Sequence, residues 1–104
     1  MFTANRLATL LFSFLFLPGY SLAAGQADAG KNLAVQLCAT CHLVTEDQKA
    51  ASTDVPTFSS IAAKYGQEID YLAGFLADPH PPMPNFNLTR REIRDLLAYI
   101  KSLK

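Results

Sequence analysis

The stretch "QLCATCHLV", Gln36–Val44, contains both cysteines of the chain and one of its two histidines. Within it, Cys38 and Cys41 are separated by two residues and His42 follows directly. A C-x-x-C pair alone supports a dithiol/disulfide couple, half of a zinc site or covalent attachment of a cofactor. The histidine favours attachment, because C-x-x-C-H is the signature for c-type haem.

In such a site each cysteine sulfur adds across one vinyl group of the porphyrin, and the two-residue spacer lets both sulfurs reach the same macrocycle. The residue after the second cysteine then lies beneath the iron. The sequence therefore predicts one haem c per chain, with Cys38 and Cys41 as its thioether attachments and His42 as the proximal axial ligand.

Three other interpretations of the motif are weaker. A thioredoxin-like dithiol would need a βαβ context, and no alternating strand pattern is found around the motif. A zinc site would have only Cys38, Cys41, His42 and His80 as soft ligands, without a second paired knuckle. A disulfide between the two cysteines is sterically awkward at this spacing.

An electron-transfer haem needs a second axial ligand, and Met83 in "HPPMPNF" is the candidate. A thioether favours ferrous iron, and Met/His ligation raises the reduction potential. Prolines at 81, 82 and 84 restrict the loop around this weak ligand. The alternatives are that Met83 only fills a gap in the core, or that His80, flanked by Pro79 and Pro81, is the ligand instead.

Residues 1–23 have the pattern of a cleaved secretory signal peptide. Arg6 is the one charge, the run from Leu7 to Leu17 is apolar, and small residues lead to a cleavage site near Ala23 or Ala24. The run is shorter than the roughly 20 residues of a bilayer-spanning helix, so no stable membrane anchor is expected after cleavage. The prediction is an exported, periplasmic domain of residues 24–104.

The domain that remains is small and nearly neutral. Removing 23 residues from 104 leaves 81, and losing Arg6 leaves eight basic against nine acidic residues, a net charge of −1. That balance gives no indication of a nucleic-acid partner. A core of this size often needs a metal, disulfide or cofactor for stability, which a haem at "CATCH" would supply.

Four short helices are expected. Asp28 can cap the first, which leads to about Cys38. Two amphipathic segments follow, one ending at Gly66 and one stopped by Pro79. Their apolar residues recur at helical spacing: Phe58, Ile61, Ala62 and Tyr65, then Ile69, Leu72, Ala73 and Leu76.

The last helix has the clearest start. Thr89 and Glu92 form a capping box, and Leu88 can pack on Ile93. Its buried stripe is Ile93, Leu96, Leu97 and Ile100. No segment of the mature chain alternates like a strand, so the predicted fold class is all-α.

With "CATCH" near the start, "PPMP" in a late loop and "EIRDLLAYIKSL" at the end, the chain resembles the class I c-type cytochromes. The resemblance covers the mature chain and implies a cytochrome c fold. It also implies that Gly30 lets the first helix cross the last one closely, against Leu96 and Tyr99. A carbonyl of Pro56 that accepts the Nδ1 proton of His42 is a further implication.

The same resemblance implies a monomeric, non-enzymatic electron-transport protein with an iron centre, which exchanges single electrons with redox proteins. The alternatives are a haem subunit of a periplasmic dehydrogenase or oxidase, and a gas- or peroxide-binding haem protein in which Met83 stays off the iron. Arg90, Arg91 and Arg94 form either a docking patch or a solvated helix face.

Overall fold

The computed structural model describes residue 15 and residues 25–104. Its four α-helices are α1 (Ala27–Leu37), α2 (Phe58–Tyr65), α3 (Ile69–Ala77) and α4 (Arg90–Ser102). Residues 25–104 contain no strand, so the predicted all-α class is confirmed. The proposed leader, residues 1–23, lies outside the described residues except for Leu15.

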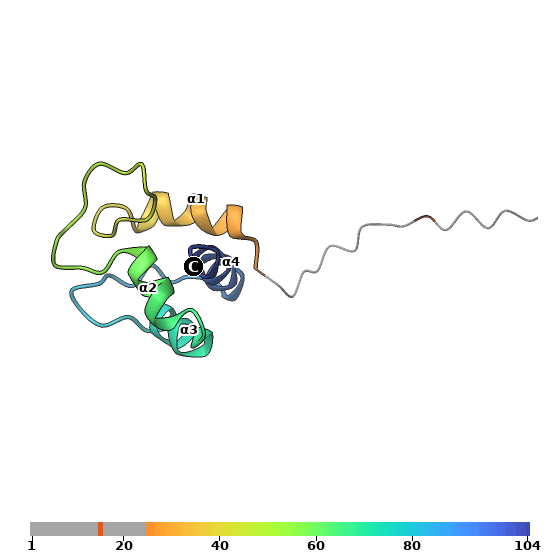
Figure 1. Cartoon of the computed structure of the whole chain (residues 1–104). Coiled ribbons are helices and arrows are strands. Elements are labelled where there is room, and N and C mark those ends of the chain that lie inside the picture. Colours follow the sequence, from red (N-terminus) through yellow and green to blue (C-terminus); the bar gives the residue numbers. More distant parts are fainter. Residues whose placement is uncertain (1–14, 16–24) are drawn as a thin grey trace, which may run out of the picture.

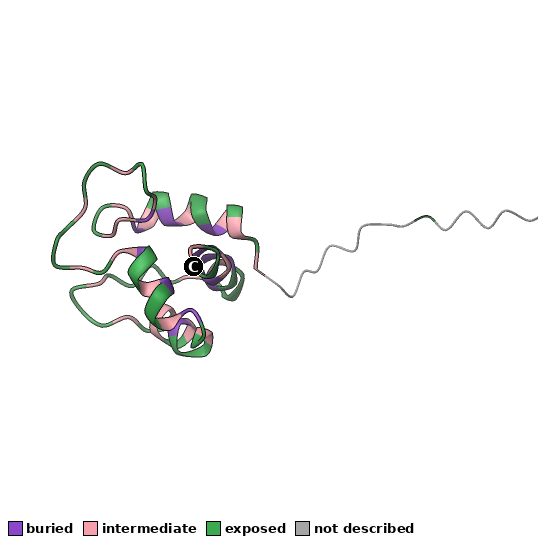
Figure 2. Ribbon diagram, in the orientation of Figure 1, coloured by how far each residue is buried: buried purple, intermediate pink, exposed green. Residues whose placement is uncertain are grey.

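Helix α4 is the centre of the packing. It contacts each of the other three helices, and most extensively α1. Figure 1 shows α1 on one side of α4, with α2 and α3 on the other, and in Figure 2 the buried residues of α1 and α2 lie on the sides turned inward. The predicted stripe of α4 is buried, together with Asp95 and Tyr99.

The start of α4 has the predicted capping box. The Thr89 hydroxyl accepts the backbone N–H of Glu92 at 3.2 Å, and the Glu92 carboxylate accepts the backbone N–H of Thr89 at 2.7 Å. Two backbone donors that the first turn leaves without helical partners are thereby satisfied.

The start of α1 differs from the prediction. Asp28 is not the N-cap: the helix begins at Ala27, and Asp28 lies in its first turn. The N-cap residue is Gln26, which makes no side-chain cap, and its backbone N–H instead donates to the Asp95 carboxylate of α4 at 2.8 Å. A carboxylate distant in sequence thus holds the residue that precedes the helix, while the charge of Asp28 is favourable at the positive end of the helix.

The helices α1 and α4 cross with their backbones in contact at Gly30. A β-carbon at this position would stand 1.9 Å from the carbonyl oxygen of Asp95 and 2.9 Å from the backbone nitrogen of Leu96. Only a glycine allows this approach, so the predicted close crossing is confirmed. Tyr99 lies one turn further along α4, where its hydroxyl donates to the carbonyl of Val44 at 2.5 Å.

Two long connections extend to the same end of the domain, on the left in Figure 1. The first, residues 38–57, joins α1 to α2 and contains the C-x-x-C-H motif; the second, residues 78–89, joins α3 to α4 and contains Met83. Gly66 directly follows α2, and Pro79 follows soon after α3, as predicted. None of the described helices has the length and apolar character needed to cross a membrane.

Candidate haem site

His42 is held from both its ring and its backbone. The ring nitrogen Nδ1 lies 2.6 Å from the carbonyl oxygen of Pro56. A carbonyl can only accept, so Nδ1 carries the proton and the lone pair of the neutral ring is on Nε2. The His42 backbone N–H donates to the carbonyl of Cys38 at 2.9 Å. The Pro56 contact that the family resemblance implied is therefore present, and it leaves Nε2 as the nitrogen able to bind a metal.

Aromatic packing connects His42 to the core. Its ring meets Phe58 edge-on, with centroids 5.5 Å apart, and Phe58 in turn lies 6.2 Å from the ring of Tyr99. Burial raises the pKa of Tyr99, so its phenol stays protonated at neutral pH and remains the donor to Val44. The motif loop is thus connected to α4 through the ring of Phe58 and the hydroxyl of Tyr99.

The side chain of Gln48 joins four backbone groups of the motif loop. Its oxygen Oε1 accepts the N–H of Val44 at 3.0 Å. Its nitrogen Nε2 lies 2.8–2.9 Å from the carbonyl oxygens of Ala39, His42 and Ala50. The sequence does not point to this residue, because a single glutamine in the polar run "TEDQKAAS" carries no periodic or motif signal.

The two cysteines occupy different environments. Cys38 is buried directly after α1, whereas Cys41 is exposed, and neither is in a disulfide. Burial raises the pKa of the Cys38 thiol to about 11. Dithiol redox catalysts need a thiol whose pKa is lowered, so the environment of Cys38 opposes the thioredoxin-like alternative.

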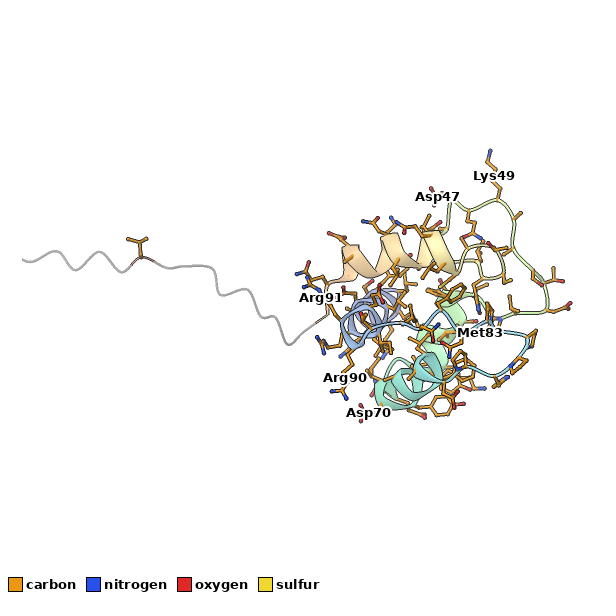
Figure 3. The ribbon with its side chains drawn as sticks, turned by 180° about the vertical axis from the view of Figure 1, so that it is seen from behind. Asp47, Lys49, Asp70, Met83, Arg90 and Arg91 are labelled. Atoms are coloured by element: carbon orange, nitrogen blue, oxygen red, sulfur yellow. The ribbon has the colours of Figure 1, made fainter. Side chains whose placement is uncertain are left out.

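Met83 and His80 lie in the second long loop, where Met83 is half-buried and His80 is exposed. Figure 3 shows Met83 within the body of the domain, whereas the labelled charged side chains lie at its rim. The backbone N–H of Met83 donates to the carbonyl of His80 at 3.1 Å. The His80 ring meets Phe75 edge-on at 5.1 Å, and its Nδ1 lies 3.1 Å from the carbonyl of Pro81.

The residues present fit a haem. The loop supplies two thiols at attachment spacing and an imidazole with Nε2 available, and Met83 supplies a soft sulfur from the other loop at the same end of the domain. Among the described residues, no three His, Cys, Asp or Glu side chains are placed to hold a metal ion by themselves. An all-α fold with such a site defines a small c-type haem protein.

Comparison with known proteins supports the class of a small c-type haem protein. A family model described as cytochrome c matches residues 27–104. The chain is 48% identical over 84 residues to cytochrome c-552 of Bradyrhizobium diazoefficiens, which is 81% of each chain. It is 30% identical over 101 residues to a cytochrome c-553-like protein of Synechocystis, 93% of this chain and 91% of that one. No solved structure gives a significant match.

The chain belongs to the cytochrome c family. It is an electron-carrier haem protein whose cofactor is haem c, with iron as the redox-active atom. The predicted cytochrome c fold of four short helices is confirmed.

Proposed function

We propose that the protein is a periplasmic one-electron carrier, with thioether bonds from Cys38 and Cys41 to the haem and with His42 and Met83 as the two axial ligands. Iron supplies the redox chemistry by cycling between its ferrous and ferric states. The residues of this chain hold the cofactor, fill both axial positions and keep small molecules away from the metal.

The observation that carries the proposal is the 2.6 Å contact between Nδ1 of His42 and the carbonyl oxygen of Pro56. Such a contact fixes the tautomer and ring orientation of a metal-binding histidine and raises its basicity. It is the arrangement expected of a permanent ligand rather than of an ordinary surface histidine.

The second ligand distinguishes a carrier from a ligand-binding haem protein. Met83 is half-buried in a loop at the same end of the domain as the motif. The competing His80 is exposed, and its ring already packs on Phe75 and contacts the Pro81 carbonyl through Nδ1. These contacts favour Met83, and with both axial positions filled the protein is not an enzyme.

Location and partners follow from the leader and the size of the domain. Cleavage after residues 1–23 would release residues 24–104 into the periplasm as a monomer without a membrane anchor. Its partners are then a redox donor and a redox acceptor, which it meets in brief encounters over a small contact area.

The ligand assignment is tested on the haem-loaded protein by absorption spectroscopy and redox titration. We expect the weak long-wavelength charge-transfer band of an iron–thioether bond in the ferric state, one-electron reduction at a positive potential, and no binding of carbon monoxide to the ferrous state at neutral pH. A five-coordinate, high-spin spectrum that changes when carbon monoxide is added would exclude the carrier function.

Export is tested separately by N-terminal sequencing of the protein from the periplasmic fraction of an expressing bacterium. The expected first residue is Ala24 or Gly25. A haem protein that begins at Met1 and sediments with membranes would contradict the predicted domain boundary.

A further inference from the structure

Gln48 is turned inward within a polar, solvent-facing segment. It is half-buried, whereas its neighbours Asp47 and Lys49 are exposed, and Figure 3 shows both of them at the outer edge of the loop. A glutamine that only solvated the loop would share the exposure of its neighbours. The partial burial of Gln48 between two exposed charged residues therefore indicates a specific role.

Its four backbone partners lie in the first part of the motif loop, from Ala39 to Ala50, which includes His42. This segment forms no helix or strand that could satisfy these groups. The nitrogen Nε2 has two hydrogens for three carbonyl oxygens, so one hydrogen is shared. An apolar side chain at position 48 would leave all four groups without this partner. The bonds to Ala39, His42 and Val44 are part-buried and the bond to Ala50 is exposed, so the first three groups would lose a partner where water replaces it less readily.

One of the four partners is the carbonyl oxygen of His42, 2.8 Å from Nε2. With its N–H bonded to Cys38 and its ring bonded to Pro56, His42 is thereby held at three points. The Pro56 contact fixes one ring atom, but the ring can still swing about that point if its backbone moves. Gln48 is the side chain that holds this backbone in place.

We infer that Gln48 is a positioning residue for His42: its carboxamide fixes the backbone of the motif loop and thereby sets the orientation of the imidazole on the iron and the reduction potential. The inference rests on the proposed ligation by His42. Hydrogen bonding around the ligands and solvent exposure of the site are the means by which a protein tunes the potential of a haem. A looser loop admits more water, which stabilises the ferric state and lowers the potential.

The test compares Gln48→Met with Gln67→Met in the full haem-loaded protein. Methionine keeps the length of the side chain and removes its hydrogen bonds, and Gln67 is an exposed residue between α2 and α3. For Gln48→Met we expect a lower midpoint potential and a changed pattern of haem-methyl resonances in the NMR spectrum of the ferric protein, which reports the orientation of the axial ligand planes. Gln67→Met should match the wild type in both.

A lower melting temperature with an unchanged potential and an unchanged resonance pattern would overturn the inference, because Gln48 would then only stabilise the loop. If Gln48→Met yields no haem protein, Gln48→Asn provides the same test, since the shorter amide cannot reach all four partners. Failure of the proposed ligation by His42 is recognised independently, because the NMR spectrum of the wild-type ferric protein would then lack the shifted resonances of an iron-bound imidazole.

Discussion

The two loops that carry the site are held in different ways. The motif loop, residues 38–57, is fixed by side-chain hydrogen bonds from Gln48, within the loop itself, and from Tyr99 of α4, which donates to the carbonyl of Val44. The bonds of the Met83 loop, residues 78–89, are local ones among the described residues, such as the turn from His80 to Met83 and the bond from the Asn87 N–H to the side chain of Asn85. This loop has four prolines instead.

This difference indicates how each of the two proposed ligands, His42 and Met83, would be kept in place. Hydrogen bonds hold one particular loop geometry, and breaking them leaves polar groups unpaired. Prolines act chiefly on the unfolded or open chain, because they reduce the conformations that it can adopt. We therefore expect the His42 side of the site to be rigid and the Met83 side to be the one that can open.

The largest effect should come from removing both attachment points on the rigid side. The double variant Cys38→Ser and Cys41→Ser should lose all covalent haem when expressed with the bacterial attachment machinery, because serine hydroxyls do not replace thiols in the addition to the vinyl groups. Extraction with acidified acetone, followed by a haem stain of the denatured protein, measures this loss. Haem that stays with the double variant through extraction would show that the attachment is elsewhere.

Removing the proposed ligand Met83 from the second loop should leave the haem attached and change the ligation of its iron. We expect Met83→Ala to abolish the iron–thioether band, open the sixth position to cyanide or carbon monoxide, and lower the potential, because the thioether that favours ferrous iron is gone. Absorption spectra with and without cyanide, and a redox titration, measure these changes.

His80→Ala is the matched control, since His80 lies in the same loop but contacts Phe75. It should leave the band and the potential close to those of the wild type. If His80→Ala changes the spectrum and Met83→Ala does not, the second axial ligand is His80, and the view that this loop supplies a weak thioether ligand is wrong.

The regular parts of this fold could be predicted because their signals are local. The Thr89–Glu92 capping box and the stripe from Ile93 to Ile100 depend on spacings of three or four residues, and the structure has both. The C-x-x-C-H motif is equally local. Gly30 needed the family resemblance, because the carbonyl that it approaches belongs to the last helix.

The side-chain hydrogen bonds that hold the motif loop could not be predicted, since each joins one polar side chain to backbone groups without a recurring sequence pattern. Gln48 and Tyr99 contact the motif loop in this way. The error at Asp28 has the same origin, because the carboxylate that receives the start of α1 is that of Asp95, distant in sequence. The sequence thus indicates candidate ligands, but not the side chains that orient the loop around them.

The rigidity of the motif loop also depends on the helix from which it starts. Gly30→Ala should destabilise the haem-loaded protein by about 1–3 kcal/mol, because the new β-carbon would collide with the backbone of α4 and push α1 away. Gly74→Ala in α3 is the control: no atom outside the neighbouring residues and the local helix backbone lies within 4 Å of that β-carbon, so it should be neutral or stabilise by up to about 1 kcal/mol. Denaturant unfolding measures both, and equal effects would mean that the crossing at Gly30 is looser than described.

The smallest effect concerns the hydrogen bond that Tyr99 of α4 donates to the carbonyl of Val44 in the motif loop. Tyr99→Phe removes the hydroxyl and leaves the buried carbonyl of Val44 without its partner, so we expect a loss of about 1–2 kcal/mol at neutral pH. Burial raises the pKa of Tyr99, so its contribution is complete below the ordinary tyrosine pKa of about 10 and is lost as the pH rises through the folded-state value. The difference in unfolding free energy between wild type and Tyr99→Phe, measured by denaturant unfolding, should therefore shrink as the pH rises through the folded-state pKa.

Tyr71→Phe is the control, at an exposed tyrosine, and its stability should differ little from that of the wild type. A Tyr99→Phe protein as stable as this control would show that the hydrogen bond adds nothing to the stability of the motif loop.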